Sequence, residues 1–121
     1  MKKAKDTISW AATRDLALAL PGVEEGSSYG MPACKVKGKL FLRLKEDGVT
    51  IVVRIDQFKR EILLHAEPET FFITDHYLTY PWILVRLASV RRETLHELLE
   101  QAWRLVAPSR LINDFDKARN T

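Results

Sequence analysis

Hydrophobic residues between positions 33 and 55 alternate with polar ones, and this period of two predicts antiparallel strands with one apolar face. The inward positions would be Cys34 and Val36, followed by every second residue of Leu40–Leu44 and of Val49–Ile55. The pattern therefore predicts two or three neighbouring strands in the middle of the chain.

Two turns set the predicted register of these strands. Lys45-Glu46-Asp47-Gly48 suits a four-residue loop, which would place Leu42 opposite Ile51. Val36-Lys37-Gly38 suits a three-residue loop with Gly38 in the left-handed conformation, which would place Lys35 opposite Lys39. The alternative is a two-residue Lys37-Gly38 turn, which would move Cys34 and Val36 to the charged face.

Helical spacing of apolar residues flanks this region. A first helix is expected over Thr7–Leu20, ended by Pro21-Gly22, and the last over about Arg92 to Val106, ended by Pro108. Asp56 is a candidate N-cap for a short helix, Gln57–His65, with Phe58, Ile62 and Leu63 as its apolar side. Two further strands are expected, Phe71–Ile73 and Trp82–Ala88, whereas the polar segment Glu24–Ser28 has the composition of a loop.

This order of elements predicts the fold class. Two long terminal helices can cover one face of an antiparallel sheet and leave the other face in solvent, so the sequence predicts a two-layer α+β sandwich. The 121 residues suit a single domain over 1–121, with a core at about 7–112 and a flexible basic N-terminus and polar C-terminus.

Composition narrows the class of protein. Hydrophobic residues make up 46% and charged residues 29%, as in ordinary globular domains, and one cysteine cannot form an internal disulfide. The apolar runs are too short for a membrane span or a signal peptide. We therefore expect a cytoplasmic protein with no membrane partner.

Positive charge is concentrated in the predicted strands. The whole chain has 19 basic and 16 acidic residues, but residues 33–60 hold eight basic residues against three acidic ones. A local basic region favours an anionic partner.

The uncovered sheet face would combine cations with apolar and aromatic groups. This combination suits nucleic acid, because cations meet phosphates and flat rings stack on bases. The candidate binding residues are Lys35, Lys37, Lys39, Phe41, Arg43, Arg54 and Arg86. Two alternatives stay open: a merely solvated face, and a protein-interaction patch of Phe41, Trp82 and Leu84.

The segment Asp75–Trp82 is a loop rich in aromatic residues. Its candidate recognition residues are His76, Tyr77, Tyr80 and Trp82, because large rings in loops often serve binding. The alternative is that these rings close the end of the core.

Catalytic and metal-binding motifs are absent from the sequence. His65, His76 and His96 lack metal-ligand spacing, so no metal or cofactor is expected. A nucleophile set of Cys34, His76 and Asp75 is the least favoured hypothesis, because Cys34 falls on the predicted core face.

Several segments together resemble the MmcQ/YjbR family of small bacterial proteins. They are Leu18–Glu25, Val36–Phe41, Pro68–Phe72, Asp75–Tyr77 with Tyr80–Trp82, and Ala102–Arg104. The resemblance implies a CyaY-like (frataxin-like) sandwich and a DNA-binding role through a double-wing motif, and it brings no catalytic residues. We therefore expect a non-enzymatic domain that binds nucleic acid, DNA rather than RNA, with a protein-interaction adaptor as the alternative.

Overall fold

The computed structural model describes residues 7–120, and the basic N-terminal residues lie outside this range. The elements are α1 (Trp10–Leu18), β1 (Val23–Ser28), β2 (Met31–Val36), β3 (Lys39–Leu44), β4 (Thr50–Arg54), α2 (Gln57–Ala66), β5 (Phe71–Phe72), the 3-10 helix η2 (Asp75–Tyr77), β6 (Trp82–Arg86), α3 (Arg92–Val106) and α4 (Ser109–Arg119).

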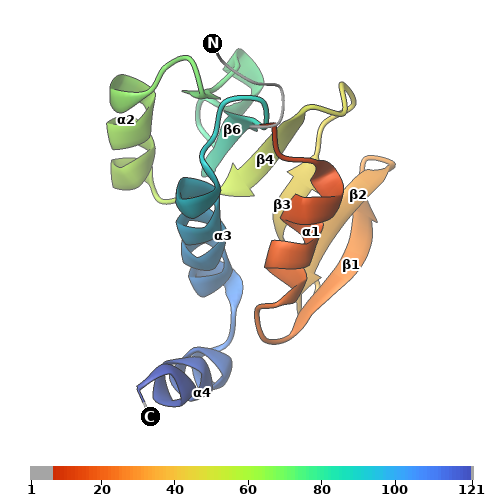
Figure 1. The fold of residues 1–121 in the computed structure, drawn as a ribbon, viewed down its shortest axis with the longest axis vertical. Coiled ribbons are helices and arrows are strands. Elements are labelled where there is room, and N and C mark those ends of the chain that lie inside the picture. Colours follow the sequence, from red (N-terminus) through yellow and green to blue (C-terminus); the bar gives the residue numbers. More distant parts are fainter. Residues whose placement is uncertain (1–6, 121) are drawn as a thin grey trace.

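The six strands form one antiparallel sheet in the order β1-β2-β3-β4-β6-β5. Helices α1 and α3 lie side by side on the same face of this sheet (Figure 1). The two-layer α+β sandwich predicted from the order of elements is confirmed. No helix among residues 7–120 is long and apolar enough to cross a membrane.

The main core lies between the sheet and these two helices. Leu42, Ile51 and Val53 are fully buried there, as the periodicity predicts, and Trp103 of α3 is buried with them. The indole N–H of Trp103 donates to the carbonyl of Pro21 at 2.8 Å, so burial of this large ring leaves its polar atom paired. This bond ties the turn after α1 to α3.

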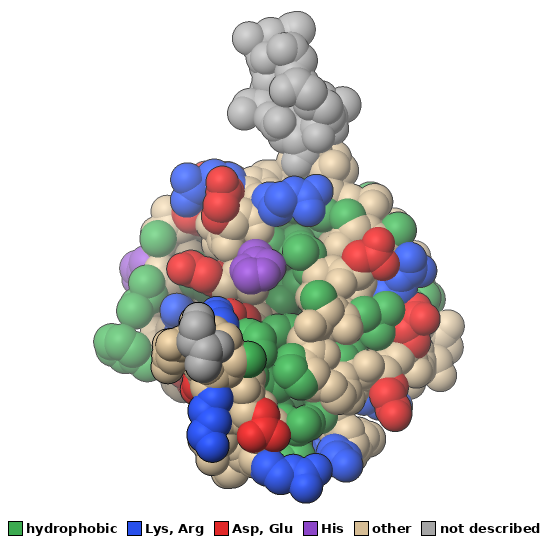
Figure 2. All heavy atoms as spheres, turned by 60° about the horizontal axis from the view of Figure 1, so that its bottom comes forward, with side chains coloured by type: hydrophobic (Ala, Val, Ile, Leu, Met, Phe, Trp, Pro, Cys, Tyr) green, Lys and Arg blue, Asp and Glu red, His purple; other side chains and the backbone are tan. Residues whose placement is uncertain are grey.

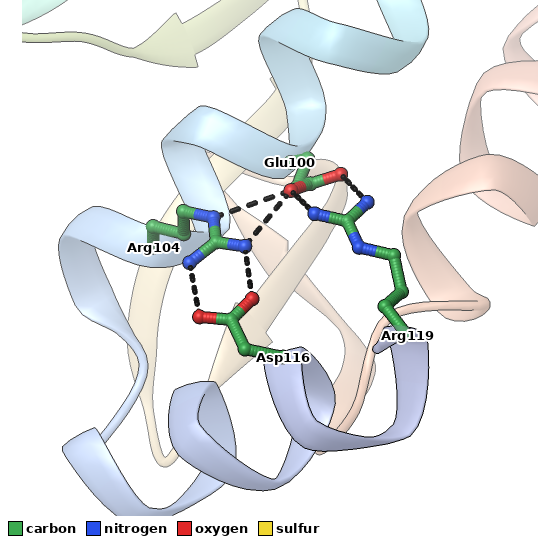
Figure 3. A network of polar contacts seen from close by, with 4 residues as sticks. All are labelled: Glu100, Arg104, Asp116 and Arg119. Carbon is green, nitrogen blue, oxygen red and sulfur yellow. Dashed lines mark hydrogen bonds and ion pairs between the residues drawn. The ribbon is translucent and has the colours of Figure 1, made fainter. Parts of the chain in front are cut away.

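The polar end of the chain forms helix α4, which packs against the end of α3. Figure 3 shows Glu100 of α3 held between Arg104 and Arg119, with Arg104 also bonded to Asp116 of α4. Phe115 adds an edge-on contact with Trp103, with ring centroids 5.0 Å apart. The sequence predicts a flexible segment here, whereas the structure has a helix. The ion pairs and this ring contact attach that helix to α3.

The predicted register between β3 and β4 is wrong by two residues. Leu42 faces Val53, and Leu44 faces Ile51. Asp47 explains the shift, because its carboxylate accepts the N–H groups of Val49 and Thr50 and so moves the loop one residue along the chain. An even shift keeps every side chain on its predicted face.

The turn between β2 and β3 has two residues rather than three. Val36 faces Lys39, and both Lys37 and Gly38 have positive φ. A turn of this length is expected to move Cys34 and Val36 to the charged face. A β-bulge prevents this, since Lys35 faces Leu40 whereas Cys34 faces Leu42. One extra residue of β3 therefore sits in the ladder.

The two-residue turn and the bulge reverse the predicted faces of Lys39, Leu40 and Phe41. Phe41, predicted on the charged face, is fully buried in the core with the helices. Leu40, predicted in the core, is half-buried on the open face.

Strand β1 replaces the loop predicted over residues 24–28. It pairs with β2 through a tight turn in which Tyr29 (φ 53°) and Gly30 (φ 77°) both have positive φ. This is the turn geometry that matches the twist of a two-stranded hairpin. The prediction failed because an edge strand with polar residues on both faces lacks the alternation of a half-buried strand.

Helix α2 begins at its predicted cap, because the Asp56 carboxylate accepts the N–H of Lys59 at 2.9 Å. Of its predicted apolar side, Leu63 packs against the core, but the other two residues do not. Phe58 is 77% exposed and Ile62 is 48% exposed, whereas Arg60 is buried. The side of α2 that faces the protein thus combines a buried arginine with the half-buried Leu63 and Leu64.

Candidate functional site

A pocket of about 310 Å³ opens on the sheet face opposite α1 and α3. Its lining comes from the turn after β1, from β3, β4 and β6, and from the loop that contains η2. The lining residues are Tyr29, Leu40, Arg43, Val52, His76, Tyr77, Tyr80 and Trp82. Aromatic rings thus surround one guanidinium.

Arg43 forms the polar part of the pocket and is only 6% exposed. One terminal nitrogen donates to the Tyr77 hydroxyl at 3.0 Å, and the other donates to the Leu44 carbonyl at 3.3 Å. Its charged carbon lies 5.2 Å from the centre of the Tyr29 ring, within cation–π range. Glu46 approaches to 3.7 Å, but its side chain is 60% exposed. The cation is therefore fixed in place and only partly neutralised.

The loop wall of the pocket is held from behind by Arg60 of α2. Its guanidinium donates to four backbone carbonyls, those of Tyr77, Leu78, Tyr80 and Trp82, at 2.7–3.1 Å. The partners of this buried cation are carbonyl dipoles of the loop, so the contact fixes the loop backbone rather than a single side chain.

Two further arginines lie on the open face beside aromatic rings. The charged carbon of Arg54 is 5.8 Å from the centre of Trp82, and that of Arg86 is 4.0 Å from the centre of Phe72. The register explains both placements, since Arg54 faces Trp82 across the β4–β6 ladder and Phe72 lies on the neighbouring strand β5. Rings that underlie a guanidinium leave its edge free for an anion.

The predicted cations are only partly brought together. Lys35 lies on the open face, and its aliphatic chain covers Gly26 of β1. Lys39 is opposite the core residue Val36, so the prediction that it shares the open face with Lys35 is wrong. Lys37 is exposed in the turn.

Phe41 cannot contribute a ring to the open face, because the bulge buries it on the helix side. Leu84 does belong to the open face but is fully covered there, in a small cluster with Val52 and Tyr77. Of the three residues of the predicted protein-interaction patch, only Trp82 keeps exposed surface.

Sequence reasoning missed Tyr29 and Leu40 as parts of the pocket. The Tyr29-Gly30 pair could have indicated a tight hairpin turn, and with it a strand on each side. Nothing in the pattern marks Leu40, because it is followed by another hydrophobic residue and the bulge decides which of the two points inward.

The structure does not assemble the hypothetical nucleophile set. Cys34 is fully buried on the helix side of the sheet, whereas His76 lines the pocket on the opposite side. The pKa of the Cys34 thiol is raised to about 11, mainly by burial and to a smaller extent by the negative charge of Glu25. The positive charge of Arg14 lowers this pKa by less. Within residues 7–120, no group of three or more potential metal ligands is clustered.

The end of the molecule that carries α4 has a mixed surface. Viewed from this end, basic and acidic side chains are interspersed around a strip of hydrophobic side chains (Figure 2). This view therefore shows no continuous basic surface.

Comparison with known proteins places the chain among its relatives. A family model described as YjbR matches residues 18–105. The chain belongs to the YjbR family. The match extends from the end of α1 nearly to the end of α3, so the YjbR domain includes the whole sheet and the pocket.

Two mycobacterial relatives are 38% identical to this YjbR chain over 69 residues, which is 56% of the chain and 54% of each relative. They are the uncharacterized protein Mb2600 of Mycobacterium bovis and the uncharacterized protein Rv2570 of Mycobacterium tuberculosis. The YjbR chain thus spans about half the length of the curated relatives it matches.

A crystal structure of Deinococcus radiodurans protein DR2400, whose domain is described as DUF419, superposes with a TM-score of 0.72. The two sequences are 21% identical, and the match covers 85% of the YjbR chain and 81% of DR2400. The likeness at this identity shows a shared fold.

Proposed function

We propose that this YjbR domain is a non-enzymatic binding domain whose open sheet face contacts nucleic acid, DNA in the first place. The observation that carries the proposal is the pocket in which aromatic rings surround Arg43. Cations for phosphates and rings for bases are the two components that such a partner requires.

Four cations on the open face can meet phosphates. Lys35, Arg54 and Arg86 are on the open face of β2, β4 and β6, and Lys45 follows β3 beside Arg43. The bonds made by Arg43 fix it inside the pocket. Glu24 and Glu46 lie nearby and reduce the positive potential, so the contact is suited to moderate affinity.

A binding role without catalysis is supported by the separation of reactive groups. The Cys34 thiol is buried, has a raised pKa and lies on the other side of the sheet from His76. A thiol in that environment is protonated near neutral pH and is a poor nucleophile.

The test is a titration of labelled single-stranded and duplex DNA by fluorescence anisotropy at several salt concentrations. Four phosphate contacts predict that log K falls against log salt with a slope of about −3 for single strands and about −4 for duplex. Arg54→Ala and Arg86→Ala should each reduce the single-strand slope by about 0.7. Arg110→Ala on α4 is the control, because this arginine is exposed and far from the sheet face.

Salt-independent binding, or wild-type affinity of the Arg54→Ala/Arg86→Ala double variant, would contradict the proposal. The first outcome would favour apolar docking of a protein through Trp82. Absence of binding to every DNA probe at low salt would reject a nucleic-acid role.

A further inference from the structure

We propose that the pocket receives one unstacked base of a single strand and that Arg43 meets the acceptor edge of this base. The inference rests on the proposed function and goes further, because it names the strand form and the part of the nucleotide that enters. Rim cations alone would bind the phosphates of a duplex equally well.

The size of the pocket supports a single base. About 310 Å³ is at the lower end of small-molecule sites and exceeds the volume of one planar heterocycle. A duplex keeps its bases stacked inside, so only an unpaired and unstacked base could reach the pocket.

The walls offer surfaces for stacking. Tyr29 is 81% exposed and Tyr80 is 55% exposed, and Trp82 of β6, which also lines the pocket, is half-buried. The His76 ring lies 6.2 Å from that of Tyr80, which extends the aromatic wall. Large exposed rings that converge on one cavity are costly in water and gain contact when a base covers them.

Arg43 gives the pocket a hydrogen-bonding direction. A guanidinium has five N–H groups, and the bonds to Tyr77 and Leu44 use two of them. Because the side chain is buried and bonded on both terminal nitrogens, it cannot follow a flexible phosphate as a surface lysine does. It can, however, donate to acceptors that are brought into the pocket.

The acceptor pattern favours guanine over adenine. Guanine presents O6 and N7 as neighbouring acceptors, the pair that arginine recognises best, whereas adenine places an amino donor beside N7. Two like donors, from Arg43 and from the adenine amino group, would then face each other.

The test compares strands of about ten nucleotides that are abasic except for one central guanine or one central adenine with a fully abasic strand, so that no other base can enter the pocket. For the wild-type protein we expect the guanine strand to bind roughly tenfold more tightly than the abasic strand, since one base–aromatic stack commonly contributes at least this much. Tyr80→Ala should abolish that difference and leave the salt slope unchanged. Tyr80 is well exposed, so this variant should fold normally.

Arg43→Gln should lose the preference for guanine over adenine. Because Arg43 is buried, its unfolding transition is measured first, and Tyr80→Ala decides the question if that variant fails to fold. Equal binding of the guanine and abasic strands with an intact salt slope would overturn the base pocket and leave the proposed function standing. Failure of these strands and of duplex DNA to bind would overturn both.

Discussion

Phe41 and Phe58 show at the residue scale how placement decides what a ring can do. Phe41 is fully buried between the sheet and the helices, whereas Phe58 on α2 is 77% exposed. Phe41→Ala should lower the free energy of unfolding by about 3–5 kcal/mol, because it removes a buried ring and leaves a cavity. Urea unfolding followed by circular dichroism measures this loss.

Phe58→Ala is the matched control, and its effect should stay within about 0.5 kcal/mol. Equal losses in the two variants would contradict the bulged register that buries Phe41. The same comparison separates stability from binding, because folded Phe41→Ala protein should keep the DNA affinity of the wild type.

At the scale of elements, Arg60 connects helix α2 to the loop that forms the pocket wall. Arg60→Lys keeps the charge, but one ammonium group cannot reach the four carbonyls that the guanidinium spans. We expect a loss of stability on the order of 3 kcal/mol and faster hydrogen exchange of amides in residues 75–82. Hydrogen exchange with mass spectrometry reports the second effect.

Arg110→Lys on α4 is the control for a change of arginine to lysine at an exposed site. If Arg60→Lys destabilises the protein without changing exchange in residues 75–82, Arg60 has only a general packing role. If it changes neither quantity, the carbonyl contacts are not important in solution.

Periodicity was sufficient to predict the sandwich and the faces of β4, because an error of two residues in the β3–β4 register leaves each side chain on its side of the sheet. It was insufficient at the bulge, where Leu40 and Phe41 are both hydrophobic and either could point inward. Periodicity also failed to predict strand β1, because residues 24–27 are not hydrophobic on either face.

The candidate site was likewise predictable from the sequence only in part. The density of rings in residues 75–82 predicted the loop wall, because such rings need a partner or a ligand. Arg60 could not be found this way, since an arginine in a helix has the sequence signature of a solvated surface residue. Its burial depends on carbonyls that are 17 to 22 residues away in the chain.

For the whole molecule, the attachment of α4 should depend on pH. Burial raises the pKa of Glu100, but hydrogen bonds from Arg119 and Arg104 lower it by more, and the hydrogen bond from Arg104 likewise lowers the pKa of Asp116. A depressed carboxylate pKa contributes stability above the ordinary value near 4 and loses it as pH falls through the folded-state pKa. Stability should therefore decrease on acidification below about pH 4.

Glu100→Gln should lower the urea midpoint at neutral pH and make the fall on acidification shallower. Glu97→Gln, an exposed site on the same helix, is the control. Identical pH profiles for Glu100→Gln and wild type would show that the network in Figure 3 does not hold α4 in place.

Strand β1 also affects how separate molecules meet. It is one outer strand of the sheet, and the other outer strand, β5, has only two residues. A free strand edge invites pairing with another chain, and charged side chains or very short strands discourage it. Glu24 and Glu25 would bring negative charge to any copy that approached the β1 edge. The protein can thus keep aromatic rings on an open face while resisting the strand-by-strand association that leads to fibres.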